Sequence, residues 1–413
     1  MKKVFAVVLA MVMVLSLGSA ALADITLANL KVEIDAPLKA YAQAYGEANG
    51  FNVKIDTFGG GEDYHGMVMA ALQSGEMYDI FMIEGIGGYN TWKEFLCDLS
   101  EQPFVAATSL AYAPEGKVVG FPIAVEGFGI GYNAEILEAA GIDPATLTTL
   151  TAFEEACKTL DEMKDELGIA APISMAASTS GGMWWVAAQH NFNAYWKGNL
   201  EYDDNSIIEM ALNGEVDRDR LTQYAKFLRV MCDYADQDVL LNGNYDAQIN
   251  LFGTGKAAFI QQGNWTDPNF ADLGATFTRG YIAEVWTDEP TTAIMVAAPS
   301  YFVVNADSPN VEEALKFLND MALTEAGQNY MVKEAGMVPA FAGVTVEPDG
   351  QFSQAVMNAA GFGDVFGWGF AEMPDGFNMD VLGPIFELFA AGEMDIDGFV
   401  NMVAEAIATI PGL

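Results

Sequence analysis

Apolar residues recur at two different spacings along the first part of the chain. The helical spacing predicts a helix over 33–50 and a second helix over about 64–74. Between them, apolar and polar residues alternate over 51–58, as in a half-buried strand. The continuous apolar run at 80–83 is typical of a parallel strand that is buried on both faces. These segments together predict a strand–helix–strand unit.

The rest of the chain continues this alternation of strands and helices. Strands are predicted at 118–123 and 129–133, on either side of a break, and at 302–304. A capping box predicts that one helix opens at Thr151, and Pro309 fits the first turn of another. No internal repeat or low-complexity tract is visible. The pattern predicts an α/β fold with more helix than strand.

The carboxyl ends of the first predicted strands are candidate binding positions. In open parallel sheets, ligands gather in the crevice beyond the carboxyl ends of the strands. Those ends fall at 59–65, which begins with three glycines, and at 84–89. We therefore expect binding residues in these two segments.

The chain begins with the features of a removable export signal. Lys2 and Lys3 are followed by an uncharged apolar run over 4–17 and by an Ala-x-Ala site that ends at Ala23. The run is shorter than the roughly 20 residues that a membrane span needs. We expect residues 1–23 to be a signal peptide, and we expect no lipid anchor because no cysteine lies near the site. The remaining length fits two lobes or domains.

The acidic composition narrows the classes of partner. The formal net charge is −39, and it becomes about −41 once the two lysines of the signal are subtracted. Such a field repels phosphate backbones and anionic lipid heads, so we expect no binding to nucleic acid or to a membrane surface. With 52% hydrophobic residues, the chain can form real cores. An acidic surface alone does not identify a cationic ligand.

The three cysteines, Cys97, Cys157 and Cys232, are too few and odd in number for a fully paired disulfide framework. Cys157 lies on the apolar face of the helix predicted after Thr151, which predicts a buried thiol. One disulfide stays open as an alternative, and no spacing favours a particular pair.

The usual signatures of catalysis are missing from the sequence. The segment 253–256 lacks the first glycine and the hydroxyl residue of a phosphate-binding loop. Two histidines far apart do not predict a metal site, and Asp395 fits a helix N-cap better than a calcium loop. The chain has many carboxylates, so a pair of the glycosidase kind stays open. We expect no catalytic residue, no metal and no cofactor.

Aromatic placement and one glutamate favour ligand binding instead. Trp184 and Trp185 follow a run of small residues, Trp265 follows a Gly-Asn pair, and Trp368 lies beside glycines. Aromatic rings in loops offer a flat apolar face and a polar edge, which suits sugars, although core packing is the competing interpretation. Glu126 lies in an apolar, glycine-flanked stretch, where a carboxylate needs a hydrogen-bond partner. A ligand hydroxyl, a backbone amide or an arginine would each serve.

Four motifs in order resemble the bacterial carbohydrate-binding proteins of ABC importers, of the maltose-binding-protein type. Residues 72–81 are similar to the family's L-x-S-G-x-x-P-D-I-F segment, with Tyr78 in place of the proline. Residues 122–133 resemble the first crossover between the family's lobes. Residues 255–265 resemble its G-K-A-A-M…G-x-W segment, and 305–336 resemble its helix pair with A-x-x-F-L…G-Q-x-Y.

The resemblance implies the two-lobed periplasmic-binding-protein fold, with a ligand cleft between two α/β lobes. On this sequence, lobe one would comprise 24–127 plus 298–345. Lobe two would comprise 128–297 plus 346–413. The lobes would close over the ligand in the cleft.

The same resemblance assigns roles to particular residues. Glu126 would be the sugar-binding glutamate at the hinge and cleft floor, and Trp265 the stacking tryptophan of lobe two. Glu84 falls at a strand end where the family places groups that bind hydroxyls. Further candidates by position alone are Tyr89, Trp184, Trp185 and Trp368.

The implied function is capture of a sugar or oligosaccharide by a monomer, which delivers it to the membrane permease of an ABC transporter. The acidic balance keeps a non-sugar ligand open, such as a polyamine, a metal complex or a peptide. A secreted glycoside hydrolase and an adhesive surface protein are further alternatives. The sequence leaves open which sugar is bound and whether the exported protein resides in a periplasm or at the cell surface.

Overall fold

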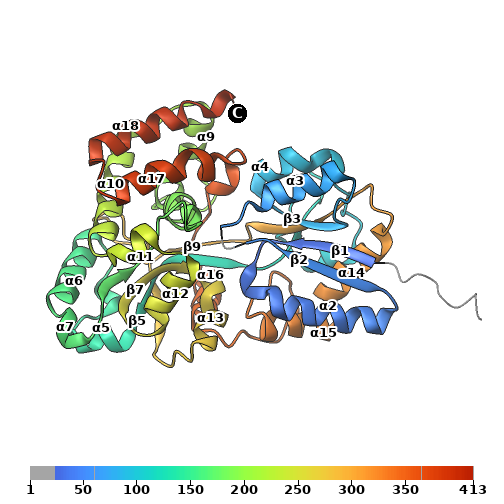
Figure 1. Cartoon of the computed structure of the whole chain (residues 1–413), viewed down its shortest axis with the longest axis horizontal. Helices are drawn as coiled ribbons and strands as arrows, with labels where there is room; N and C mark the ends of the chain where they lie inside the picture. The colour runs from blue at the N-terminus through green and yellow to red at the C-terminus, as the bar shows by residue number, and fades with distance from the viewer. Residues whose placement is uncertain (1–23, 60, 364, 413) are drawn as a thin grey trace, which may run out of the picture.

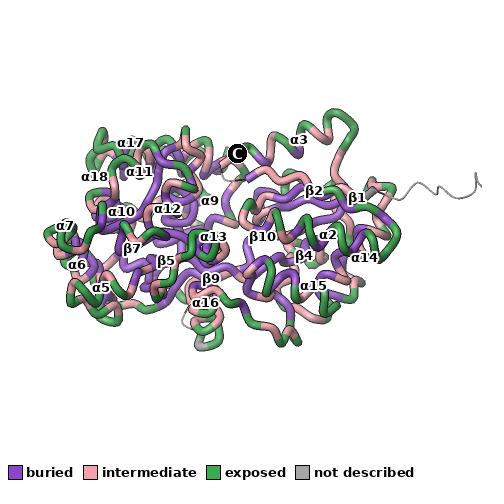
Figure 2. Tube along the Cα trace, turned by 60° about the horizontal axis from the view of Figure 1, so that its bottom comes forward, coloured by how far each residue is buried: buried purple, intermediate pink, exposed green. Residues whose placement is uncertain are grey.

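The computed structural model describes residues 24–59, 61–363 and 365–412, which form two lobes set side by side (Figure 1). The predicted signal, residues 1–23, lies outside the described residues. Each lobe has its own sheet and its own large hydrophobic core. Buried segments run through the middle of each lobe, and more exposed segments surround them (Figure 2). The fold is the two-lobed α/β fold that the sequence predicts.

Lobe one is built on a five-stranded sheet. Its strands are β1 (Asp24–Asn29), β2 (Asn52–Thr57), β3 (Ile80–Glu84), β4 (Phe121–Pro122) and β10 (Ser300–Val304). In the sheet they follow the order β2-β1-β3-β10-β4. β1 runs parallel to β2 and to β3, whereas β10 is antiparallel to β3. The parallel strands therefore bring their carboxyl ends to one edge of the sheet, as the sequence predicts for β2 and β3.

Helices cover the sheet of lobe one. They are α2 (Asp35–Asn49), α3 (Tyr64–Ser74), α4 (Gly85–Trp92), α14 (Val311–Leu323) and α15 (Glu325–Asn329), with the short turn η1 (Val32–Ile34) before α2. The predicted helix at 64–74 is confirmed, and Asp63 caps it by accepting a hydrogen bond from the Gly66 N–H. The helix predicted at 33–50 is confirmed as η1 followed by α2.

Lobe two is built on a second sheet, of six strands. They are β5 (Glu126–Asn133), β6 (Ala171–Ser174), β7 (Ala257–Gly263), β8 (Arg279–Ile282), β9 (Ile294–Ala297) and β11 (Val365–Phe366). The order is β11-β9-β5-β7-β6, and β8 also pairs with β5. β5 and β7 pair antiparallel in the middle of the sheet, and both are almost wholly buried.

The helices of lobe two are more numerous, and the C-terminal pair, α17 and α18, lies at the top of lobe two in the view of Figure 1. They are α5 (Ala134–Ala139), α6 (Leu150–Glu162), α7 (Lys164–Leu167), α8 (Asn193–Lys197), α9 (Ser206–Leu212), α10 (Arg218–Asp233), α11 (Gln237–Asn242), α12 (Tyr245–Gly253), α13 (Asp267–Asp272), α16 (Gln351–Phe362), α17 (Gly383–Ala390) and α18 (Ile396–Ile407). A π-helical turn, η5 (Trp185–Asn191), precedes α8. α18 begins at the N-cap Asp395, as predicted.

Several local predictions need correction. The N-cap of α6 is Thr149, whose hydroxyl accepts from the Ala152 N–H, whereas Thr151 already lies inside the helix. α14 begins two residues after Pro309, because Asn310 adopts the non-helical N-cap conformation. The strand predicted at 118–123 is only two residues long, and β5 begins at Glu126 rather than at 129.

Cysteines are isolated from one another within the described residues. Cys97, Cys157 and Cys232 are all free thiols. Cys157 is fully buried, which confirms that prediction, and burial raises the pKa of its thiol. No helix among residues 24–59, 61–363 and 365–412 combines the length and the apolarity that a membrane span requires.

Candidate functional site

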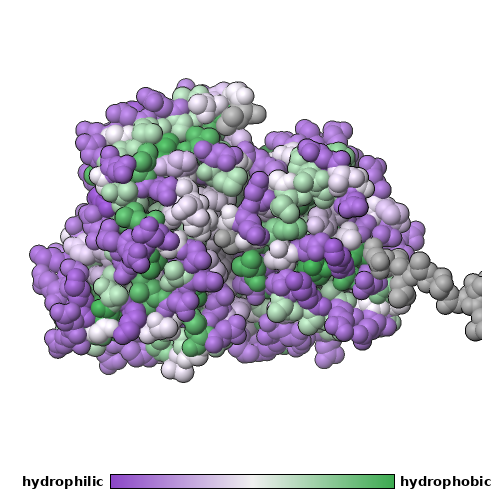
Figure 3. All heavy atoms as spheres, viewed as in Figure 1, coloured by the Kyte–Doolittle hydropathy of each residue, from purple (hydrophilic) through white to green (hydrophobic). Residues whose placement is uncertain are grey.

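A small cavity lies where the two lobes meet. Its volume is about 120 Å³, and both lobes contribute to its lining. A furrow between the lobes is visible on the surface of the molecule (Figure 3). Lobe one supplies polar residues that follow the carboxyl ends of β1 and β3, whereas lobe two supplies mainly aromatic side chains. We call it the smaller cavity, to distinguish it from a larger one that adjoins it.

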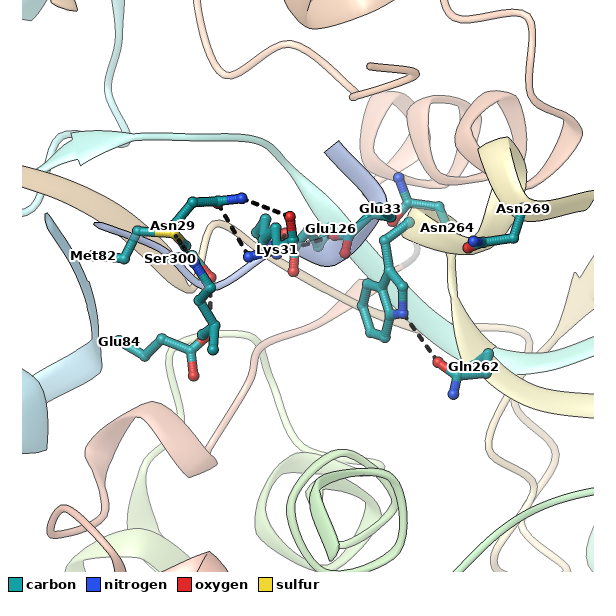
Figure 4. Close-up of polar contacts among 12 residues, drawn as sticks. Asn29, Lys31, Glu33, Met82, Glu84, Glu126, Gln262, Asn264, Asn269 and Ser300 are labelled. Atoms are coloured by element: carbon teal, nitrogen blue, oxygen red, sulfur yellow. Dashed lines mark hydrogen bonds and ion pairs between the residues drawn. The ribbon is translucent and has the colours of Figure 1, made fainter. Parts of the chain in front are cut away.

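An ion pair forms the polar side of the smaller cavity (Figure 4). The Lys31 ammonium contacts Glu126 Oε1 directly and lies 3.9 Å from Glu33 Oε1. The Lys31 and Glu126 side chains are only 11% and 7% exposed. The Asn29 amide at the end of β1 donates to the Lys31 carbonyl at 2.7 Å and accepts from the Lys31 N–H at 3.1 Å. This turn directs the chain from β1 into the cavity.

Charges in this cluster stabilise one another. Burial lowers the pKa of Lys31, but the carboxylates of Glu126 and Glu33 outweigh burial, so the pKa of Lys31 is raised. Burial raises the pKa of Glu33 and of Glu84, and the nearby Lys31 opposes both shifts. A charged ammonium beside carboxylates presents both hydrogen-bond donors and acceptors. A ligand rich in hydroxyl groups can form hydrogen bonds with both.

Glu84 ends β3 and lies close to this cluster. Its Oε1 accepts a hydrogen bond from the Ser300 hydroxyl of β10 at 2.8 Å. Its neighbour in sequence, Gly85, begins α4 with a φ of 55°, in the region that favours glycine. The strand end therefore turns sharply and leaves the carboxylate at the rim of the cavity.

Aromatic side chains form the opposite wall. The rings of Trp185 and Trp265 are 6.1 Å apart, and the His190 ring lies 5.1 Å from that of Trp265. Trp184 and Tyr245 complete this wall. The Trp184 Nε1 is buried and has no hydrogen-bond partner among the described residues.

His190 takes part in the wall as a neutral ring. Burial lowers its pKa to about 3, and Nδ1 donates to the Trp185 carbonyl at 2.9 Å. Nε2 then carries no proton. Both residues belong to η5, whose wide π-helical turn places them on the same side of lobe two.

The Trp265 ring is fixed by buried amides. Its Nε1 donates to Gln262 Oε1 at 3.0 Å, and Gln262 Nε2 donates to Gln248 Oε1 at 2.9 Å. Both glutamines are fully buried. A Cβ at Gly263 would lie 2.0 Å from the indole, so only glycine allows the ring to fold back over the strand end. The indole N–H is thus occupied, and its flat face is what remains for a ligand.

The turn at Gly263 and Asn264 is hydrogen-bonded to β5, the strand with which the chain enters lobe two. The Asn264 Oδ1 accepts from the Gly127 N–H at 2.8 Å. Trp265 and Glu126 are therefore held in register although they lie far apart in sequence. This contact gives a physical reason for the Gly-Asn-Trp pattern.

A larger cavity of about 540 Å³ continues from the smaller one. The two share Leu30, Glu62, Glu84, Trp184 and Gln189. Its other walls come from the start of α3, from α4, and from residues 370–380 of lobe two. The Asn378 Oδ1 is buried at this cavity without a partner among the described residues. Together the cavities form a cleft with room beyond a single ring.

Five of the seven predicted site residues line the smaller cavity: Glu84, Glu126, Trp184, Trp185 and Trp265. Trp368 lines neither cavity but packs behind the wall, 6.2 Å from Trp265 and 5.1 Å from His190 between ring centres. Tyr89 is buried in α4 against Tyr112, 6.3 Å between ring centres, and lines neither cavity.

Sequence reasoning missed Lys31, Glu33, His190 and Tyr245. The signal for Lys31 is the apolar alternation of Ile25 and Leu27, which marks β1 just before it. Among the described residues, no group of three or more His, Cys, Asp or Glu is arranged to hold a metal ion.

Comparison with known proteins identifies the family of this chain. The model of a family described as bacterial extracellular solute-binding proteins matches residues 40–359, well over half of the chain. The chain belongs to this family. As a solute-binding protein, it has its cavities where its two lobes meet.

One curated relative of this solute-binding protein is the melibiose/raffinose/stachyose-binding protein MelE of Bacillus subtilis (strain 168). The two are 23% identical over 274 residues, which is 63% of this chain and 61% of that relative. The chain thus spans less than two thirds of the length of the curated relative it matches.

Solved structures share the whole fold. A sugar transporter from Bacillus licheniformis in complex with stachyose has a TM-score of 0.76 at 17% identity, covering 94% of this chain and all of that one. A chitin oligosaccharide binding protein has a TM-score of 0.76 at 17% identity, covering 95% and 100%. The binding protein RafE in complex with raffinose has a TM-score of 0.71 at 18% identity, covering 94% and 100%.

Proposed function

We propose that this solute-binding protein captures a sugar or oligosaccharide between its lobes and delivers it to the permease of an ABC transporter. One observation carries the proposal: an aromatic wall on lobe two faces a buried ammonium–carboxylate cluster that follows the strands of lobe one. Aromatic faces pack on the C–H face of a sugar, and the charged groups bind its hydroxyl rim. The sugars named for its relative and for solved structures of the same fold support the same proposal.

Roles for the individual residues follow from their positions. Glu126, Lys31 and Glu84 would hydrogen-bond hydroxyl groups. Trp265, Trp184 and Trp185 would stack on sugar rings, whereas Trp368 would support Trp265 from behind. Tyr89 would not contact the ligand, because it is buried outside both cavities.

The action would be binding with closure and no catalysis. Contacts made by both lobes to one ligand favour the closed state and shift the population toward it. The lobe boundaries, at 127, 297 and 345, are part of this proposal. The separate cores of the two lobes support them, and β5, which begins at Glu126, carries the chain across the first boundary into the sheet of lobe two. We propose a monomer that is exported through the signal at 1–23, without a lipid anchor, to a periplasm or to the cell surface.

A calorimetric screen of the mature protein tests the proposal. Titration with raffinose, stachyose and a chitin trisaccharide should give saturable binding for at least one sugar. Spermidine, a polycation, is titrated in parallel as the competing class of ligand, because carboxylates predominate along the larger cavity: Glu62, Asp63, Glu84, Asp375 and Asp380. Binding of spermidine without binding of any sugar would replace the sugar by a cationic solute, and turnover of a glycoside would contradict the absence of catalysis.

A further inference from the structure

A polar contact between the lobes lies at the larger cavity, apart from the Lys31–Glu126 pair of the smaller one. The His65 Nε2 of α3 donates to the Asp375 Oδ2 at 2.6 Å. The Thr91 hydroxyl of α4 donates to the same oxygen at 3.1 Å. His65 and Thr91 belong to lobe one, whereas Asp375 lies in lobe two between η8 (Phe370–Glu372) and η9 (Phe377–Leu382).

Two glycines of α4 make this approach possible. A Cβ at Gly85 would lie 2.0 Å from the Ala371 carbonyl oxygen, and a Cβ at Gly87 would lie 2.6 Å from the Asp375 backbone nitrogen. Any other residue at these positions would hold the two lobes apart. The backbones therefore fit closely around the His65–Asp375 contact.

The contact sits at the rim of the larger cavity. His65 and Asp375 both line that cavity, and their side chains are 36% and 35% exposed. Closure of the lobes over a ligand would form this contact, and opening would break it. The contact and the ligand therefore favour the same closed state.

We propose that His65, Thr91 and Asp375 form a latch that holds the lobes closed and tightens when His65 takes up a proton. The latch rests on the lobe closure of the proposed function. It makes His65 and Asp375 positioning residues, because they act on affinity through closure rather than through contact with the sugar.

The sign of the pH dependence follows from the groups that face His65. The hydrogen bond that His65 donates to the Asp375 carboxylate raises the pKa of His65 above its ordinary value of 6.5, although burial opposes it, and Asp63 adds to the rise. The closed state thus holds the proton more tightly than the open state. The extra stability of closure is complete below about pH 6.5 and is lost as pH rises through the raised pKa. The other charged groups at this cavity are carboxylates: Glu62, Glu84 and Asp380.

The limit at low pH comes from Asp375. Burial raises its pKa, but its hydrogen bond and its charge interaction with His65 outweigh burial, so the pKa is lowered. The latch therefore weakens again only in acid well below pH 6, when Asp375 loses its charge.

Other groups with a shifted pKa include Glu33 and Glu84, which line the smaller cavity and have their pKa values raised by burial. The chain has two histidines, and the pKa of His190 is lowered to about 3, so His190 stays neutral near pH 7. Glu284 has its pKa raised to about 8 by burial, but it bonds Gln261 inside lobe two. The wild type and a His65 variant share all of these groups, so the difference between the two proteins isolates the contribution of the latch.

Small-angle scattering of the ligand-free mature protein between pH 5.5 and 8.5 tests the latch directly. The wild type should be more compact at pH 6 than at pH 8.5, whereas His65→Gln and Asp375→Asn should each lose that dependence. Lys164→Gln, which removes an exposed ion pair within lobe two, is the matched control and should behave as the wild type. Equal pH dependence in the wild type and in His65→Gln would overturn the proposal.

Binding gives an independent readout. For a neutral sugar such as raffinose or stachyose, wild-type affinity should be about two- to fivefold higher at pH 6 than at pH 8.5, as fits a half-exposed ion pair. In His65→Gln the two affinities should agree. Sugar binding with no dependence on His65 would reject the latch and leave the proposed function standing. Compaction that depends on His65, without binding of any sugar, would support the latch and reject the proposed function.

Discussion

The two walls of the smaller cavity are built on opposite principles. Lobe one contributes charged side chains from the ends of parallel strands, and they stabilise one another through Lys31. Lobe two contributes flat rings that are held by packing and by buried amides such as Gln262. The first wall depends on a charge balance, and the second depends on shape. A substitution in the charged wall should therefore change the free energy of unfolding, whereas a substitution in the aromatic wall should change the affinity for sugar.

The largest expected effect is on the charged wall. Lys31→Met leaves Glu126 and Glu33 buried without their cation, so the free energy of unfolding at pH 7 should fall by about 3 kcal/mol. Urea denaturation measures it. As pH falls, Glu33, whose pKa is raised by burial, becomes protonated, so the difference from the wild type should shrink.

Two controls sharpen that result. Lys31→Met combined with Glu126→Gln should recover part of the lost stability, because one unpaired charge is removed with its partner. Lys39→Met removes an ion pair whose lysine side chain is 50% exposed, and it should cost less than about 0.5 kcal/mol. Equal losses for Lys31→Met and Lys39→Met would mean that the cluster is not electrostatically buried.

The next effect concerns the aromatic wall. Trp265→Ala should weaken sugar affinity at least tenfold, about 1.4 kcal/mol, because the stacking face is removed, and it should abolish the ligand-induced change in fluorescence. Trp286→Phe is the matched control, since Trp286 packs against Arg220 in lobe two and lines neither cavity. Affinity like that of the wild type in Trp265→Ala would remove Trp265 from the site.

A smaller effect is expected from the amide behind the ring. Gln262→Leu removes the acceptor of the Trp265 N–H, which should cost about 1 kcal/mol of affinity, or roughly fivefold, because the ring loses its orientation. In a Trp265→Phe background, which has no N–H, the same change should cost little. The double-mutant cycle measures the coupling, and independence of the two changes would show that Gln262 does not orient the ring.

Sequence patterns predicted the elements that have a regular period or a motif. The helices α2 and α3 and the apolar strand β3 follow directly from spacing. Glu126 and Trp265 were found because each lies beside glycine in a recognisable motif, and the structure shows why Gly263 is needed there.

What escaped the sequence depends on contacts between distant segments. Lys31 gains its importance only because Glu126, 95 positions later, reaches it through the crossover. Trp185 follows a run of small residues and Trp368 lies between two glycines, but only Trp185 lines the cavity. Which ring faces the cleft is decided by the π-helical turn and by the packing of lobe two, and neither has a one-dimensional signature.

Trp368 gives the finest test of the aromatic wall. Its ring lies behind Trp265 and His190, and its buried Nε1 has no hydrogen-bond partner in the part of the chain that the structure describes. Trp368→Phe therefore loses no hydrogen bond and keeps an aromatic support, so sugar affinity measured by calorimetry should fall only about twofold. A tenfold loss, as large as that expected for Trp265→Ala, would mean that Trp368 itself touches the ligand.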